Sequence, residues 1–307
     1  MKNYIHIIRP INLIIVALSQ VLIYYVFLFP FFEMANLVPV LNPFLLTLFI
    51  LDTVIIAAGG YIVNDIVDYK ADLINKPEKT YIHPSSLTIK KAWLFYFTMV
   101  IIGLIVAYYI GNEIGKIHLV TIYPIAVLLL AAYSYALKKM PLAGNLVVAI
   151  FCVFVPGIIW FAENEMINQL PSSKTLLVKG TLMAYMVFGF LATMAREIIK
   201  DIEDMDGDIQ SNYWTLPVIV GPTASKAFAQ FFMILLIISY FLWINPFHGF
   251  QRTIMIILVA VFMLLPSLYI SYQIYKARMK ADYSKISSFL KYLMILSLVI
   301  FLLIPFI

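Results

Sequence analysis

Two acidic motifs of identical spacing are the residues of this chain best suited to chemistry. Their aspartates occupy positions i, i+3 and i+7, as Asp65, Asp68 and Asp72 in the first motif and as Asp201, Asp204 and Asp208 in the second. Residues at these intervals share one face of an α-helix, so each motif predicts a stripe of three carboxylates at a helix end. Because like charges at this spacing repel one another, each stripe requires a cation beside it.

Magnesium is the cation that such stripes favour. Carboxylate oxygens are hard ligands, and Mg²⁺ usually binds through one or two carboxylates, several waters and the phosphates of a substrate. Two stripes can hold two ions, which would stabilise the negative charge that develops on a departing diphosphate. The alternative is that each stripe is a solvated charged segment balanced by lysines. The occurrence of two matched stripes favours the metal sites.

The elements that must position these stripes are membrane-spanning helices. Of 307 residues, 63% are hydrophobic and 12% are charged, and the mean hydropathy is +0.96. Ordinary soluble domains contain about 25% charged residues, so this composition excludes a water-soluble globule. Nine apolar windows have about the 20 residues that cross a bilayer. They lie at 11–32, 44–63, 92–110, 117–137, 142–162, 176–195, 222–244, 253–273 and 288–307.

We therefore predict an all-α polytopic membrane protein with nine transmembrane helices in one bundle and short cytoplasmic cap segments. Residues 1–307 are expected to form a single membrane-embedded domain. The recurrence of the acidic motif suggests two related halves, about 1–140 and 141–307. The single cysteine, Cys152, excludes an intramolecular disulfide.

The distribution of charge predicts the orientation. With a cytoplasmic N-terminus, most of the 21 basic residues fall in segments on the inner side of the membrane, as the positive-inside rule requires. Nine spans then place the C-terminus outside. Most of the 16 acidic residues lie on the same inner side. They concentrate in two expected cytoplasmic loops, about 64–91 and 196–221, where we expect the active site.

The motif pair resembles the UbiA superfamily of intramembrane prenyltransferases, in which such motifs follow the second and sixth of nine helices. The resemblance covers nearly the whole chain. Other local matches are Arg9-Pro10 with Asn12, Asn75-Lys76-Pro77, Tyr133-Ser134, Lys138-Lys139 and Gly144-Asn145. The resemblance implies Mg²⁺-dependent transfer of a polyprenyl group from its diphosphate to an acceptor.

Residues 196–208 look most like the branch of this family that makes digeranylgeranylglyceryl phosphate. That branch joins a geranylgeranyl group to geranylgeranylglyceryl phosphate during ether-lipid synthesis. An aromatic acceptor, as in quinone, haem or chlorophyll pathways, is the alternative. The chain departs from the family at Lys79-Thr80, where many members have Arg-Pro. A lysine can hold phosphate as a point charge but lacks the bidentate fork of arginine.

The resemblance and the residue types together define an expected site. The six motif aspartates are expected to hold Mg²⁺, with Asp65, Asp68, Asp201 and Asp204 as catalytic residues together with Lys138, which would contact the diphosphate. The expected substrate-binding residues are Asn12, Asn64, Lys79, Tyr133, Lys139, Arg196 and Lys200.

Two of these assignments have local alternatives. Arg196 and Lys200 are spaced i, i+4 and can bind an acceptor phosphate, or they can pair with Glu197 or Asp204 instead. Lys138 can contact the diphosphate or simply contribute to the positive-inside charge.

A cation transporter is the strongest alternative that is not an enzyme, because acids at a membrane face also gather cations. A transporter predicts polar groups that continue through the spans, whereas these spans carry few. The expected partners are therefore a polyprenyl diphosphate, a lipid or aromatic acceptor and membrane lipid. Nucleic acid is not expected, because the basic residues form no continuous stripe, and no obligate protein partner is evident.

Overall fold

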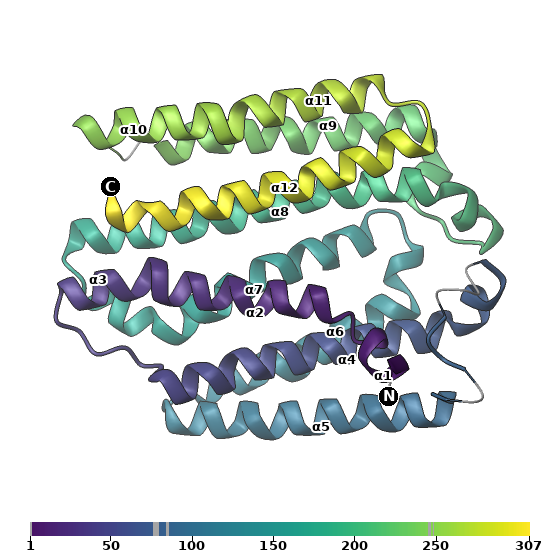
Figure 1. Ribbon diagram of the computed structural model, residues 1–307, viewed down its shortest axis with the longest axis horizontal. Helices are drawn as coiled ribbons and strands as arrows, with labels where there is room; N and C mark the ends of the chain where they lie inside the picture. The colour runs from purple at the N-terminus through teal and green to yellow at the C-terminus, as the bar shows by residue number, and fades with distance from the viewer. Residues whose placement is uncertain (1, 76–79, 84–85, 245–246, 248) are drawn as a thin grey trace. The chain divides into compact units, whose positions relative to one another are not determined.

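The computed structural model describes residues 2–75, 80–83, 86–244, 247 and 249–307, and it contains no strand within them. Side chains are described for these residues except 2, 70–72, 74–75 and 118–119. Figure 1 shows the helices, which run roughly parallel to one another within each part of the chain. Their bounds are α1 Lys2–Ile7, α2 Pro10–Leu22, η1 Ile23–Leu28, α3 Phe29–Met34, α4 Pro43–Asn75, α5 Ile89–Glu113, η3 Ile117–Thr121, α6 Ile122–Tyr135, η4 Leu137–Lys139, α7 Ala143–Gln169, α8 Ser172–Gln210, α9 Leu216–Ile244, α10 Gly249–Val259, η5 Ala260–Leu264, α11 Leu265–Lys276, α12 Lys280–Leu303 and η6 Ile304–Phe306.

The prediction of an all-α, multi-pass membrane protein is confirmed. Within the described residues, eight helical segments are long and apolar enough to cross a bilayer. The ninth expected window, 117–137, contains the 14-residue helix α6 after a short 3-10 turn. At 1.5 Å per residue, α6 is about 21 Å long, which is shorter than the hydrocarbon core.

Each acidic motif lies at a helix end, as its spacing predicted, but the two loops begin later in the chain than the expected starts near residues 64 and 196. Helix α4 has 33 residues and continues to Asn75, while α8 has 39 residues and continues to Gln210. These lengths correspond to about 50 Å and 58 Å, well beyond a hydrocarbon core of about 30 Å. Each acidic motif therefore lies on the last turns of a helix that extends past the membrane interior.

The chain forms two compact units. The first comprises Met1–Val21, Pro39–Leu137 and Phe161–Glu163, and the second comprises Leu22–Val38, Lys138–Trp160 and Asn164–Ile307. The predicted single domain and the predicted relation between its two halves stay predictions.

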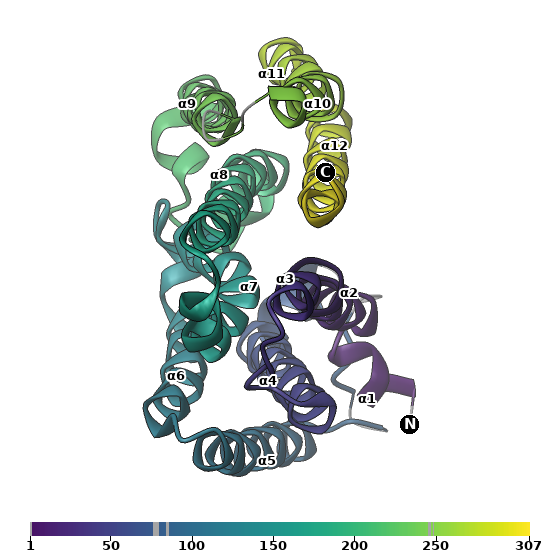
Figure 2. The same ribbon diagram turned by 90° about the vertical axis from the view of Figure 1, so that its left-hand side faces the viewer.

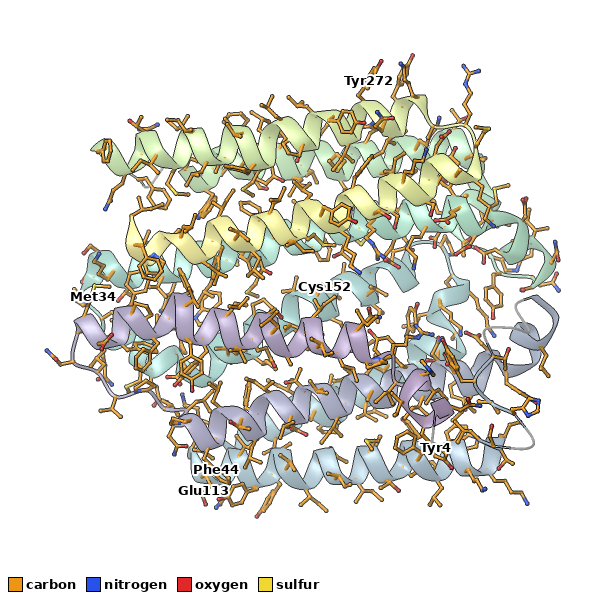
Figure 3. All side chains as sticks on the ribbon, viewed as in Figure 1. Tyr4, Met34, Phe44, Glu113, Cys152 and Tyr272 are labelled. Carbon is orange, nitrogen blue, oxygen red and sulfur yellow. The ribbon has the colours of Figure 1, made fainter. Side chains whose placement is uncertain are left out.

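In the first unit, α4 packs against α5 and α6, and Figure 2 shows these three helices nearly end-on. Figure 3 labels Tyr4 at one end of the unit and Phe44 and Glu113 at the other. A cluster of buried apolar side chains fills the end near Tyr4: Ile7, Ile62, Val63, Ile66, Ile82, Leu87, Ala92 and Tyr96. This cluster joins α1, the end of α4, the segment before α5 and the start of α5, and so fixes the helix end that carries the first motif.

In the second unit, α8 is the central helix and packs along α9 and α12, while α11 packs against α9 and α12. Aromatic rings fill the contacts, including Phe188 of α8 against Tyr240 and Trp243 of α9. The extensive packing of α8 orients its last turns, which carry the second motif.

Two π-helical turns interrupt otherwise continuous spans, and a proline follows each. Pro30 comes two residues after η1, and Pro266 comes two residues after η5. Proline has no N–H to donate, and its ring displaces the carbonyl four residues earlier, so a locally widened turn accommodates it without ending the helix.

Candidate active site

The first acidic motif occupies the end of α4 in the first unit. Ile62, Val63 and Ile66 bury one face of this helix in the apolar cluster. Asp65 and Asp68 remain half-buried, and the Asn64 side-chain amide donates to Asp68 Oδ2 at 3.1 Å. Asn64 therefore orients a motif carboxylate, while its expected role in substrate binding stays a prediction.

Arg9 is part of this end of the unit, although it was not among the expected site residues. Its Nη2 donates to Asp65 Oδ1 at 2.8 Å, and its guanidinium lies over the Tyr61 ring, 4.9 Å from the centroid. Arg9 has a φ of 53°, and its carbonyl accepts from the Asn12 N–H, in the turn between α1 and α2. The sequence signal was the Arg9-Pro10 pair, which matches the family but does not reveal the aspartate partner.

Four further expected residues belong to the first half of the chain. Asn12 on α2 and Tyr133 on α6 are both half-buried. The backbone of Asp72 belongs to α4, whereas its side chain lies outside the described part of the structure. Lys79 lies outside the described residues altogether.

The second motif occupies the end of α8 in the second unit, where each aspartate has different surroundings. The Asn145 side-chain amide of α7 donates to Asp201 Oδ2 at 2.8 Å. The Thr215 hydroxyl, at the start of α9, donates to Asp208 Oδ2 at 2.8 Å. Asp204 lies between these two aspartates in the sequence and is half-buried. Its carboxylate makes no hydrogen bond or ion pair with the described residues. A cation beside Asp204 would therefore displace none of the described side chains.

Asn145 and Thr215 were not predicted as site residues. Asn145 was noted only within the Gly144-Asn145 match, and Thr215 carried no signal in the sequence. Each donates to a motif carboxylate from outside α8, Asn145 from α7 and Thr215 from the residue that precedes α9. These two hydrogen bonds hold the ends of the stripe in place.

One helical turn before Asp201, two cations share a buried carboxylate. Arg196 Nη1 donates to Glu197 Oε1 at 2.5 Å, and Lys200 Nζ lies 3.6 Å from Glu197 Oε2. The alternative of pairing with Glu197 is thus realised for both cations. Arg196 and Lys200 nevertheless keep 26% and 40% of their side-chain surface exposed, so both remain accessible to an anion.

Lys138 and Lys139 lie in the short turn η4, and both are half-buried. The Lys139 ammonium lies 5.4 Å from the centroid of the Tyr213 ring, and its carbonyl accepts from the Trp214 N–H at 2.9 Å. Lys139 therefore ties η4 to the segment that follows α8. Lys138 shares this turn, which places it in the same unit as the second motif.

The donor set of both motifs suits a hard divalent cation. Among the described side chains, no group of three or more His, Cys, Asp or Glu residues is close enough to enclose an ion. Mg²⁺ usually takes one or two carboxylates and completes its shell with waters and phosphate oxygens. Hydrogen bonds from Asn64, Asn145 and Thr215 orient the carboxylates in the way that ligating groups are commonly supported.

Sequence comparisons connect the chain with known proteins. The model of the UbiA prenyltransferase family matches residues 15–299. Digeranylgeranylglyceryl phosphate synthase of Methanobrevibacter smithii is 30% identical over 229 residues, which cover 75% of this chain and 73% of that protein. A protein of the same name from Saccharolobus solfataricus is 32% identical over 219 residues, covering 68% of this chain and 67% of its own.

Structural comparisons support the same fold. A structure of digeranylgeranylglyceryl phosphate synthase in membranes aligns with a TM-score of 0.69 at 24% identity, over 98% of this chain and 97% of that chain. A UbiA homolog from Archaeoglobus fulgidus bound to DMAPP and Mg²⁺ aligns with a TM-score of 0.61 at 14% identity, over 96% of this chain and 98% of that chain.

Proposed function

The chain belongs to the UbiA prenyltransferase family, and from this premise we propose that it transfers a geranylgeranyl group from geranylgeranyl diphosphate to geranylgeranylglyceryl phosphate. The similarity to relatives named digeranylgeranylglyceryl phosphate synthase, over 67–73% of their length, is the observation that carries this proposal. The cations Arg196 and Lys200, which directly precede the second motif on α8, supply the charge that a phosphate-bearing acceptor needs.

In this proposal, both acidic motifs bind Mg²⁺ with the diphosphate. Asp65, Asp68 and Asp72 serve in the first motif, and Asp201, Asp204 and Asp208 serve in the second. When bound, the metal neutralises charge on the departing diphosphate. The oxygen-only donor set and the orienting hydrogen bonds from Asn64 and Asn145 support this assignment.

Other residues would bind and orient the two substrates. Lys138 contacts the diphosphate, and Arg196 with Lys200 holds the phosphate of the acceptor. Asn12, Lys79, Tyr133 and Lys139 are proposed as further substrate contacts. Apolar helix walls exclude water, which protects the reactive allylic carbon from hydrolysis.

The proposed reaction conserves atoms and charge in a simple way. The bond between the first prenyl carbon and the diphosphate oxygen breaks, and its electron pair leaves with the diphosphate. The acceptor hydroxyl oxygen forms the new ether bond to that carbon, and its proton passes to the departing diphosphate or to water. The phosphate of the acceptor is unchanged by the reaction, so it contributes only to binding.

A transfer assay with labelled geranylgeranyl diphosphate tests the acceptor. We expect a labelled ether lipid with geranylgeranylglyceryl phosphate in the presence of Mg²⁺, no product after chelation, and no product with aromatic acids. Thin-layer chromatography of the extracted lipid measures the outcome. Prenylation of an aromatic acid instead would establish the alternative acceptor class, and the absence of transfer to every acceptor would refute the proposal.

We also propose a cytoplasmic N-terminus and active site, with the C-terminus outside. Because Asn36 and Gln210 are both exposed, cysteine at either position can report this topology in a Cys152→Ser background. In intact cells, an impermeant maleimide should label Asn36→Cys, which lies between α3 and α4, and spare Gln210→Cys at the end of α8. The opposite labelling pattern would invert the proposed orientation.

A further inference from the structure

Glu197 uses both of its carboxylate oxygens on cations of its own helix. Oε1 accepts from Arg196 Nη1 at 2.5 Å, and Oε2 lies 3.6 Å from Lys200 Nζ. Only 12% of the Glu197 side-chain surface is exposed. A carboxylate so far removed from water is stable when its charge is compensated, and here two positive charges surround it.

The charges of this triad do not cancel. Two cations and one carboxylate leave one positive charge within the triad, and the side chains that carry it are 26% and 40% exposed. In addition, the Nε of Arg196 is buried and makes no hydrogen bond with the described residues. Buried donors are normally satisfied, so an unpaired guanidinium N–H beside excess positive charge indicates the position of an anionic ligand.

Glu197 also determines where the two cations point. Arg196 and Lys200 are four residues apart, so they already share one face of the helix. Their contacts with Glu197 fix the direction of each long side chain on that face. Without that carboxylate, two long side chains would retain their rotamer freedom and would have to lose it on binding.

We propose that Glu197 is a positioning residue, which holds Arg196 and Lys200 as a preassembled cation pair for the phosphate of the acceptor. The inference rests on the proposed function, because it takes the acceptor to carry a phosphate. Glu197 itself does not touch the substrate in this arrangement. It lowers the cost of ordering the two groups that do.

Cys152 gives this site a built-in reporter. Cys152 is an exposed residue of α7, where Figure 3 labels it. It lies beside Thr193 of α8 and within the electrostatic reach of Arg196 and Glu197. Cys152 is the only cysteine of the chain. The rate at which a small permeant reagent alkylates it therefore measures whether a ligand occupies this region, and the measurement does not require catalysis.

The test compares Glu197→Gln and Glu197→Asp with the control Glu203→Gln, which changes a half-buried acid on the same helix. We expect Glu197→Gln to raise KM for geranylgeranylglyceryl phosphate by roughly tenfold, with kcat and KM for geranylgeranyl diphosphate nearly unchanged. Glu197→Asp should recover part of the loss. In the same variants, protection of Cys152 by geranylgeranylglyceryl phosphate should require a correspondingly higher concentration.

The outcomes separate this inference from the proposed function. Equal effects of Glu197→Gln on both substrates, a fall in kcat alone, or an unchanged protection of Cys152 would overturn the positioning role. If the wild-type protein transfers nothing to geranylgeranylglyceryl phosphate, the proposed function fails instead. If Glu197→Gln fails to fold but Glu197→Asp folds, the test uses Glu197→Asp alone. An unchanged KM of that variant for geranylgeranylglyceryl phosphate would then overturn the positioning role.

Discussion

Asp204→Ala should reduce Mg²⁺-dependent prenyl transfer by roughly a thousandfold, the scale of losing a principal electrostatic contact in a transition state. The Asp204 carboxylate makes no hydrogen bond or ion pair with the described residues, so its removal breaks no contact that they provide. The variant should therefore remain a folded membrane protein, with an unchanged elution profile in size-exclusion chromatography. Steady-state transfer rates across a Mg²⁺ titration measure the effect.

The same helix provides a matched control for this prediction. Asp206 is exposed and lies outside the i, i+3, i+7 stripe, so Asp206→Asn should retain nearly full activity. Asp68→Ala in the first motif should reproduce the loss seen with Asp204→Ala. Full activity of either alanine variant would refute the assignment of both motifs to magnesium and diphosphate.

The spacing of the acidic residues predicted their arrangement because spacing and helix geometry are directly linked. The stripe at Asp201, Asp204 and Asp208 lies on one helix, as the i, i+3, i+7 pattern requires. The expected loop starts came too early because hydropathy marks where a chain leaves lipid, whereas a helix ends where its hydrogen bonds and packing end. Charged residues after an apolar run do not by themselves end a helix.

The partners of the motif residues were less predictable, because they come from distant parts of the chain. Arg9 and Asp65 are 56 positions apart in the sequence, and so are Asn145 and Asp201. Such contacts depend on which helices pack together, and one sequence does not specify this pairing. At Arg196 and Lys200 the residue types were compatible with either an acceptor phosphate or Glu197. In the structure both cations pair with the buried Glu197 carboxylate, and both side chains nevertheless stay partly exposed.

Glu163→Gln should cause a large loss of stability while leaving the acidic motifs intact. Glu163 is fully buried on α7, and its two oxygens accept the backbone N–H groups of Val40 and Leu41 at 3.0 and 2.8 Å. Glutamine has the same shape, but its amide nitrogen would face one of those N–H groups and leave it unpaired. An unsatisfied buried hydrogen-bonding group costs about 1–3 kcal/mol, and here two such groups oppose each other.

This loss should appear as a lower unfolding temperature in detergent, by roughly 5–10 °C at about 2–4 °C per kcal/mol. Glu165→Gln is the matched control, because Glu165 is an exposed acid two residues further along the same helix, and it should unfold within about 2 °C of the wild type. Prenyl transfer measured well below the transition should be nearly unchanged in Glu163→Gln, because Val40 and Leu41 precede α4, whose opposite end carries the first motif. An unfolding temperature equal to that of the wild type would show that Glu163 contributes little to holding α7 against the start of α4.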